Sequence, residues 1–302
     1  MNKNVFITGG SGQDGRILIS LLKKKKINLT VLYKDKKPKT RSGIKFTRKN
    51  LSNKRKIDII FKKTKPDIVL HLAANNPSHL EKNYKLFFKE NFLATKNIFL
   101  STFDANKKAK FIFCSSSQIF KKQTGIVSEK SKVFATTDYT RFRIKSDSLM
   151  LKFKKEKKIN YTNAILFNHD SEFRNKKFLL PRIMSSIIRR DTIFLNDIMK
   201  ENIFSDFSHA EDVCKGLLKL MFSRVNKDKL ILSSGKKSSI NKIIEYVIKK
   251  NKLNIDISFN TKIIKKCLIG NHNLSKKVLK WSPQKNIFIA ANEIYKNYIL
   301  KK

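Results

Sequence analysis

A tyrosine and an arginine, Tyr139 and Arg143, lie four positions apart in a stretch with the apolar pattern of a helix, so both side chains share one helical face. A tyrosine acts as an acid or a base when a nearby cation favours its phenolate, and Arg143 supplies such a cation. Upstream, Ser116 follows an apolar run that predicts a strand, and its hydroxyl can bond a substrate oxygen or Tyr139. Taken singly, these residues are better explained as a surface Tyr–Arg pair and as helix-capping serines.

Near the start of the chain, three glycines are spaced three residues apart, between an apolar run from Val5 and an apolar-periodic stretch from Ile17. In a strand–turn–helix, Gly9 allows the tight turn, Gly12 lets backbone N–H groups approach a pyrophosphate, and Gly15 lets the helix pack closely. The segment predicts a dinucleotide site, and an ordinary glycine-rich turn is the alternative.

Short apolar runs alternate with helical patterns through the first half of the chain. The expected strands are residues 5–7, 29–33, 67–72, 110–114 and 163–167. The expected helices are residues 15–25, 54–63, 82–103 and 139–157. This alternation predicts an α/β fold, a Rossmann-type doubly wound parallel sheet that binds ligands at the carboxyl ends of its strands.

The pattern loosens after about residue 168. We expect residues 1–167 to form an NAD(P)-binding Rossmann domain and residues 168–302 a smaller C-terminal α/β substrate-binding lobe. The boundary is soft, because the chain can re-enter the sheet. Helix candidates in the second half are residues 178–189, 210–222 and 240–249, and a strand candidate is residues 230–233.

Composition narrows the class of protein. The 302 residues suffice for a substantial core, and no stretch approaches the roughly 18 apolar residues that a membrane span needs. No secretory signal is visible, and the three cysteines form no metal-spaced cluster. We therefore expect a cytoplasmic protein with no membrane partner and no metal.

The net charge of +44 is also typical of proteins that bind nucleic acid. The lysines are spread over the whole chain with no single basic arm, and Lys, Ile, Asn and Phe are abundant together, as in a compositionally biased genome. We expect no nucleic-acid partner. The charge would still attract an anionic nucleotide substrate and cofactor.

The order of motifs is more specific than any single motif. A glycine loop, Leu-Ala-Ala, a serine triplet and Tyr-x-x-x-cation together resemble the extended short-chain dehydrogenase/reductases, the NAD(P)-dependent epimerases and dehydratases of nucleotide sugars. The resemblance is strongest to GDP-mannose 4,6-dehydratases, over nearly the whole chain. The matching segments are Thr8-Gly9-Gly10-Ser11-Gly12-Gln13-Asp14-Gly15, His71-Leu72-Ala73-Ala74-Asn75, Phe167-Asn168-His169-Asp170-Ser171, Asp206-Phe207-Ser208-His209-Ala210-Glu211-Asp212 and Leu279-Lys280-Trp281-Ser282-Pro283.

This resemblance implies a site. Ser116, Gln118, Tyr139 and Arg143 would occupy the catalytic positions, and Ser116 and Asn168 would contact substrate. The implied cofactor-binding residues are Gly9, Gly12, Gln13, Asp14, Gly15, Lys34, Leu72, Ala73, Ala74, Tyr139, Arg143, His169 and Arg174. Asn168 and His169 can alternatively cap or bridge a turn. The substrate would be a nucleotide sugar, GDP-linked, and the protein a homo-oligomer, as family members commonly are.

Lys34 decides the expected cofactor. It follows the second strand where the resembled enzymes carry an arginine, and such a cation suits the 2′-phosphate of NADP. An acidic residue at this place would instead bind the ribose hydroxyl of NAD, and Asp35 keeps NAD as the alternative.

Two catalytic positions and one segment depart from the pattern. Arg143 stands for the lysine of Tyr-x-x-x-Lys, and Gln118 stands for the glutamate that removes the sugar C5 proton. An amide is no base near neutral pH. The family's C-terminal Arg-Pro-x-Glu has no counterpart near residues 259–266.

Three hypotheses for the function remain. The chain is a GDP-mannose 4,6-dehydratase-like lyase whose base is Glu129 or Asp138, a nucleotide-sugar 4-reductase or epimerase, or a catalytically impaired nucleotide-binding homologue.

Overall fold

The computed structural model describes residues 2–33, 44–48, 51–75, 84–258 and 266–300. The chain divides into two compact units, each assembled from separate segments. The first unit comprises Met1–Lys121, Ser131–Ile165 and Leu217–Leu230, and the second comprises Lys122–Lys130, Leu166–Gly216 and Ile231–Lys302. The assignment of one region to cofactor and another to substrate stays a prediction.

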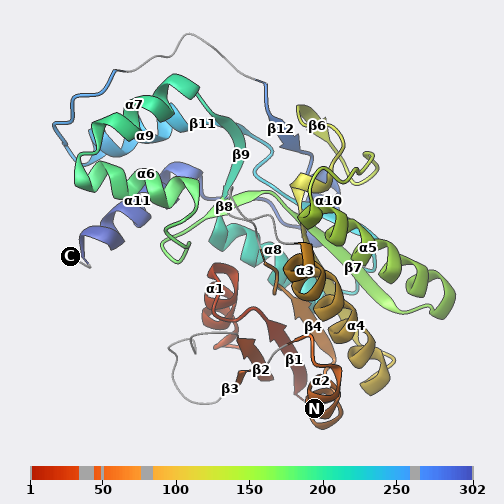
Figure 1. The fold of residues 1–302 in the computed structure, drawn as a ribbon. Helices are drawn as coiled ribbons and strands as arrows, with labels where there is room; N and C mark the ends of the chain where they lie inside the picture. The colour runs from red at the N-terminus through yellow and green to blue at the C-terminus, as the bar shows by residue number, and fades with distance from the viewer. Residues whose placement is uncertain (1, 34–43, 49–50, 76–83, 259–265, 301–302) are drawn as a thin grey trace. The chain divides into compact units, whose positions relative to one another are not determined.

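A seven-stranded sheet runs through the first unit (Figure 1). Its strands, in spatial order, are β10 (Lys229–Leu232), β7 (Asn160–Leu166), β5 (Lys110–Ser116), β4 (Ile68–His71), β1 (Lys3–Thr8), β2 (Ile27–Tyr33) and β3 (Lys45–Arg48). Strand β1 pairs in parallel with both β2 and β4, and β4 pairs in parallel with β5. The predicted α/β, Rossmann-type fold is confirmed, and the five expected strands of the first half lie where the apolar runs predicted them.

Both faces of the central strands are buried. Phe6 packs on one face with Phe61, Phe99 and Phe111, where the helices α2 (Lys54–Thr64), α4 (Ala94–Ala105) and α5 (Asp138–Lys157) contribute to one apolar cluster. The residues on either side of Phe6 in β1 are also buried, and they point to the opposite face. Burial on both faces explains why these strands read as continuous apolar runs. Helix α1 (Gln13–Leu22) follows β1.

The long helix expected at residues 82–103 is interrupted. The described part begins as α3 (Tyr84–Phe87), continues as the π-helix η1 (Phe88–Leu93) and ends as α4. Within η1, the Asn91 side chain accepts a hydrogen bond from the Asn75 N–H at 2.7 Å and donates to the Asn75 carbonyl at 3.0 Å. This clamp ties the wide turn to the segment after β4, which is a distant contact that apolar periodicity does not report.

The second unit has its own apolar core, formed largely by α6 (Leu179–Arg189), α9 (Ile240–Lys250) and α11 (Ile287–Ile299). Its strands form a three-stranded sheet in the order β11 (Lys237–Ser239), β9 (Phe204–His209) and β8 (Asn168–Asp170), and a pair of β12 (Leu268–Gly270) with β6 (Gly125–Val127). Its remaining helices include α7 (Thr192–Glu201) and α10 (Asn273–Leu279); α8 (Ala210–Phe222) is shared with the first unit. Of these elements, α6, α8 and α9 were predicted from the sequence, whereas α7, α10, α11 and the short strands were not.

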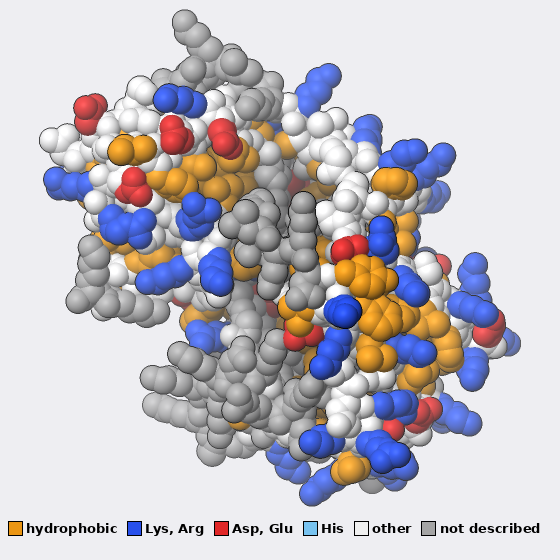
Figure 2. All heavy atoms as spheres, in the orientation of Figure 1, with side chains coloured by type: hydrophobic (Ala, Val, Ile, Leu, Met, Phe, Trp, Pro, Cys, Tyr) orange, Lys and Arg blue, Asp and Glu red, His pale blue; other side chains and the backbone are white. Residues whose placement is uncertain are grey.

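The positive charge is widely distributed. Figure 2 shows Lys and Arg side chains scattered over the visible face instead of gathered in one strip. None of the described helices has the length and hydropathy needed to cross a membrane.

One buried carboxylate organises three segments of the second unit. Asp206, in the middle of β9, accepts hydrogen bonds from the Ser234 N–H at 2.9 Å and the Gly235 N–H at 3.1 Å. It also accepts from the Ser234 hydroxyl at 2.5 Å and from the Gly270 N–H at 3.0 Å. Asp206 therefore holds the turn after β10 and the end of β12 against the central strand.

Replacing Asp206 by alanine would leave these buried donors without their acceptor. We expect Asp206→Ala to lower the free energy of unfolding by roughly 2–4 kcal/mol. Urea denaturation measures the change. The control is Asp197→Ala, which removes an exposed carboxylate 3.8 Å from the Lys200 ammonium and should cost less than about 0.5 kcal/mol. Equal losses in the two variants would contradict the role given to Asp206.

Candidate active site

The glycine turn lies where the strand order of the sheet changes direction. Strand β1 has β2 on one side and β4 on the other, and the crevice beyond the carboxyl ends of such strands is where open α/β sheets bind ligands. Gly9 has a φ of +76°, and a Cβ at this position would lie 2.9 Å from the Ala73 nitrogen. The turn after β1 and the Leu72-Ala73-Ala74 segment after β4 are thus in direct contact.

The start of α1 leaves room for a ligand. A Cβ at Gly15 would lie 2.5 Å from the Gly9 carbonyl oxygen, so only glycine lets the helix approach the turn this closely. Gly12 is the N-cap of α1, and a Cβ there would meet only the Gly9 oxygen, at 3.3 Å, among the described residues. A phosphate could therefore approach the helix N-terminus over Gly12, next to Gln13 and Asp14 in the first turn.

A chain of hydrogen bonds beneath the turn passes through a neutral histidine, His71. The Ala73 N–H donates to the Thr8 hydroxyl at 3.1 Å, and this hydroxyl lies 2.8 Å from His71 Nδ1. His71 Nε2 lies 2.9 Å from the Thr95 hydroxyl, which donates to the Asn91 carbonyl at 2.9 Å. These directions require Nε2 to carry the proton and Nδ1 to accept from Thr8. Burial, with the nearby charge of Arg143, lowers the pKa of His71 to about 3.

At the end of β5, Ser116 and Gln118 occupy a polar turn. Ser116 is half-buried and caps the short 3₁₀-helix Ser117–Ile119, accepting a hydrogen bond from the Gln118 N–H at 3.3 Å. The Gln118 side chain is exposed. Because an amide cannot take a proton near neutral pH, this position offers hydrogen bonds but no basicity.

Helix α5 positions Tyr139 in its first turn. The Thr137 hydroxyl accepts from the Thr140 N–H at 3.2 Å, and the Thr140 hydroxyl accepts from the Thr137 N–H at 3.0 Å, which forms a capping box. The helix therefore begins at Asp138, and Tyr139 and Arg143 come one turn apart, as their spacing predicted. The Arg143 guanidinium carbon lies 5.9 Å from the centre of the Tyr139 ring.

Arg143 is almost completely buried. Its guanidinium carbon lies 4.1 Å from the centre of the Phe113 ring, and Nη2 donates to the Cys114 carbonyl near the end of β5. Burial lowers the pKa of Arg143, although the phenol of Tyr139 is among the groups that oppose this. Among the described residues, neither Nε nor Nη1 has a hydrogen-bond partner. A buried guanidinium with two unpaired nitrogens suits a ligand that brings oxygen acceptors, such as the hydroxyls of a ribose.

Asn168, His169 and Arg174 belong to the second unit. The Asn168 side chain is exposed and donates to the Ser205 hydroxyl at 2.8 Å, whereas His169 is buried with Nδ1 2.6 Å from the Phe167 carbonyl. Arg174 Nε lies 3.2 Å from a carboxylate oxygen of Asp170. Each side chain thus has a local partner, and their roles toward cofactor and substrate stay predictions.

The two carboxylates considered as substitutes for a base at position 118 are engaged elsewhere. Glu129 accepts a hydrogen bond from the Ile231 N–H at 3.0 Å, and burial raises its pKa. Asp138 lies 3.3 Å from Arg141 in the first turn of α5. Lys34 and Asp35, on which the choice between NADP and NAD depends, lie outside the described residues, as does most of the segment at residues 259–266.

Two further side chains shape this site without having been assigned a role from the sequence. His71 stood beside the Leu-Ala-Ala motif, and its position directly after a fully apolar run was the signal that its ring is buried. Asn91 gave no signal, because its partner Asn75 is sixteen residues away and in a loop.

His209 and Asp212 bind within the second unit. His209 Nε2 lies 2.8 Å from the Glu293 carboxylate, and the Asp212 carboxylate accepts from the Gln284 N–H at 2.6 Å.

Comparison with known proteins agrees with this geometry. The model of the NAD dependent epimerase/dehydratase family matches residues 5–231, which is more than half of the chain. The chain belongs to this family. The resemblance that the motifs indicated is thereby confirmed at the level of the family.

Several curated members of the family are similar over most of the chain. A GDP-6-deoxy-D-talose 4-dehydrogenase from Aggregatibacter actinomycetemcomitans is 24% identical over 265 residues, covering 85% of this chain and 83% of that enzyme. A GDP-mannose 4,6-dehydratase from Sordaria araneosa is 23% identical, covering 82% of this chain and 48% of that longer protein. A GDP-mannose 4,6 dehydratase from Drosophila melanogaster is 22% identical, with 82% and 68% covered.

Solved structures share the fold. RMD from Pseudomonas aeruginosa, complexed with NADPH, superposes with a TM-score of 0.82 at 18% identity and covers 100% of this chain and 99% of its own. The UDP-glucose 4-epimerase from Thermotoga maritima, with UDP-glucose, gives a TM-score of 0.84 at 16% identity and the same coverage. Identities this low establish the common fold and leave the reaction to the residues of the site.

The neutral state of His71 makes the stability of this family member dependent on pH. The folded pKa of about 3 lies below the ordinary value of 6.5, so the unfolded chain binds more protons between these values and stability falls as pH falls. We expect His71 to remove about 2 kcal/mol between pH 7.5 and pH 5. Urea unfolding at both pH values measures this loss, and His71→Gln, which keeps a donor and an acceptor, should lack it. Identical pH dependence in the two proteins would contradict the assignment.

Proposed function

We propose that this chain transfers hydride between a nicotinamide cofactor and C4 of a nucleotide-linked sugar, as a 4-ketosugar reductase or the reverse dehydrogenase. The observation that carries the proposal is the group of side chains on the first turns of α5 and at the end of β5. Tyr139 can exchange a proton with a sugar oxygen, because the buried guanidinium of Arg143 lies one helical turn away and favours the phenolate. Gln118, an amide, occupies the position where dehydration needs a base. The 4-dehydrogenase named among the relatives supports this choice.

Each residue then has a physical task. The glycine turn and the N-terminus of α1 hold the cofactor pyrophosphate, and Arg143 offers Nε and Nη1 to its ribose. The bound cofactor supplies the hydride that reaches C4. Tyr139 donates its hydroxyl proton to O4 as the carbonyl is reduced, and the charge of Arg143 stabilises the phenolate that remains. The Ser116 hydroxyl bonds O4 and orients it.

The choice of cofactor and nucleotide rests on the sequence and on relatives. We assign NADP, because Lys34 suits a 2′-phosphate and a neighbouring structure is complexed with NADPH; NAD, found with another neighbour, is the alternative. We assign a GDP-linked sugar, because the curated relatives that cover most of this chain are named for GDP-sugars. A homo-oligomer without a nucleic-acid partner stays our prediction.

Dehydration at C5–C6 is the second candidate function. Curated relatives named GDP-mannose 4,6-dehydratase and the Gln13-Asp14-Gly15 and Asn168-His169 motifs favour it. The reaction would begin with oxidation at C4, in which Tyr139 takes the O4 proton and the C4 hydride passes to bound NADP. Water would then be lost across C5–C6, and the hydride would return to C6. Its second stage needs a base, and Gln118 cannot be one.

Mass spectrometry of two incubations tests the proposal. With NADPH and a GDP-linked 4-keto-6-deoxyhexose, the sugar should gain two hydrogen atoms, whereas GDP-mannose with NADP should lose no water. Tyr139→Phe keeps the ring but lacks the proton donor, so the rate of reduction should fall by about 10²–10⁴-fold with NADPH binding retained. Loss of water from GDP-mannose would favour the second candidate. NADPH binding with no conversion of either sugar would indicate a binding protein and contradict both.

Restoring a carboxylate should add the missing step. We expect Gln118→Glu to lose water from GDP-mannose at a rate about 10²–10⁴-fold above the detection limit that bounds the starting protein, because the new carboxylate can take the C5 proton. Gln123→Glu makes the same change of charge at another exposed glutamine and serves as the control. Should both variants leave GDP-mannose unchanged, more than a base separates this site from a dehydratase.

A further inference from the structure

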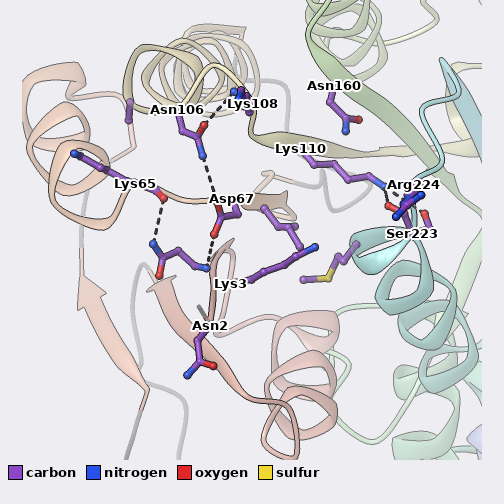
Figure 3. A pocket seen from close by; sticks show the side chains of 14 residues that line it. Asn2, Lys3, Lys65, Asp67, Asn106, Lys108, Lys110, Asn160, Ser223 and Arg224 are labelled. Atoms are coloured by element: carbon purple, nitrogen blue, oxygen red, sulfur yellow. Dashed lines mark hydrogen bonds between the residues drawn. The ribbon is translucent and has the colours of Figure 1, made fainter.

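A pocket lies in the first unit, at the edge of the sheet opposite the glycine turn. The first residues of four strands line it (Figure 3). They are Lys3 of β1, Ile68 of β4, Lys110 of β5 and Asn160 of β7. The pocket has a volume of about 830 Å³, within the range of small-molecule sites. Because strands of six or seven residues separate the two edges, this pocket lies about 20 Å from the proposed active site.

Its lining is cationic beyond the general charge of the chain. Five cationic residues and a single acidic one contribute to its lining; the cationic residues are Lys3, Lys65, Lys108, Lys110 and Arg224. That carboxylate, Asp67, already accepts the Asn4 N–H at 2.8 Å and the Asn106 side chain at 3.4 Å. Among the described residues, none of the five cations forms an ion pair with it or with another carboxylate. No described carboxylate therefore neutralises these five charges.

Lys110 gives the pocket a fixed wall. Its side chain is buried, and its ammonium donates to the Leu220 carbonyl at 2.6 Å, to the Ser223 carbonyl at 2.9 Å and to the Ser223 hydroxyl at 3.3 Å. These bonds hold the end of α8 in place, and the next residue, Arg224, is thereby kept at the pocket. Burial, together with the repulsion from Lys3, lowers the pKa of Lys110 to about 8, and an anion would relieve that repulsion.

Asn160 adds an unused acceptor. Its Oδ1 atom is buried and has no hydrogen-bond partner among the described residues. Figure 3 shows Asn160 on the same side of the pocket as Lys110, Ser223 and Arg224. A buried acceptor left unpaired beside several cations suits a ligand that carries a hydroxyl or amino donor as well as negative charge.

We propose that this pocket binds a phosphorylated small molecule of about nucleotide size. Its phosphate would accept hydrogen bonds from Lys3 and Arg224 beside the positive charge of Lys110, whose own donors are already used, and a donor group would reach Asn160. The site is separate from the one assigned to catalysis, so the inference does not depend on the proposed reaction. Phosphate is favoured over a carboxylate because its oxygens are numerous enough to accept bonds from several cations together.

Calorimetric titration at an ionic strength of about 0.15 M tests the pocket. ADP, tripolyphosphate and inorganic phosphate are the three probes, and each titration is repeated with saturating NADPH so that the glycine turn is occupied. We expect one saturable ADP site that NADPH does not abolish, with weaker binding of both inorganic probes. The double variant Lys3→Gln/Arg224→Gln should weaken ADP binding by roughly tenfold or more.

A charge-matched control separates a built site from the diffuse field of the protein. Lys24→Gln/Lys277→Gln removes two exposed lysines and should leave ADP affinity within about twofold. Equal weakening in both double variants, or binding of a long oligonucleotide without any saturable ADP site, would overturn the proposal. So would wild-type ADP affinity in the pocket variant, because the binding would then belong elsewhere. Lys3→Arg keeps the charge and should retain the ADP affinity of the starting protein. Matching melting temperatures show that each variant is folded.

Discussion

The burial of one positive charge under the end of the central sheet governs the candidate site. Arg143 is held against the Phe113 ring and the Cys114 carbonyl, and the neutrality of His71 follows in part from this charge. A cation in such a place has to be balanced, because transfer from water is costly. A phenol that can become an anion, and a ligand rich in oxygen, both provide that balance. An arginine in place of the lysine that the motif predicts keeps the positive charge and changes its geometry.

Much of the first unit was predictable because its determinants are local. The apolar runs that gave β1, β4 and β5, the glycine spacing before α1 and the start of α5 are all encoded within a few residues. The parallel sheet follows from their alternation, since strands covered on both faces must be apolar throughout. Tyr139 and Arg143 share a helical face for the same local reason. These parts of the site needed no knowledge of distant contacts.

The remainder depends on contacts between residues far apart in the chain. Sequence periodicity could not show that Arg143 would be buried, that Asn91 would clamp Asn75, or that the Glu129 carboxylate would bind the backbone of β10. Asp206 is the clearest case. Its segment was recognised only as part of the family resemblance, yet its oxygens accept hydrogen bonds from three backbone N–H groups and one hydroxyl. In this chain, the motif that contains Asp206 therefore supports the architecture of the second unit.

The π-helix between α3 and α4 also restricts how the chain can evolve. A turn of this kind contains one residue more than an α-turn, and each residue advances a helix by about 100°. Losing one residue would rotate everything on one side of η1 and withdraw the Asn91 amide from the loop that it clamps. Surface loops tolerate such changes of length, whereas this segment does not. A deletion here would displace Asn91 from the turn after β4, so the site depends on the number of residues in this segment as well as on their identity.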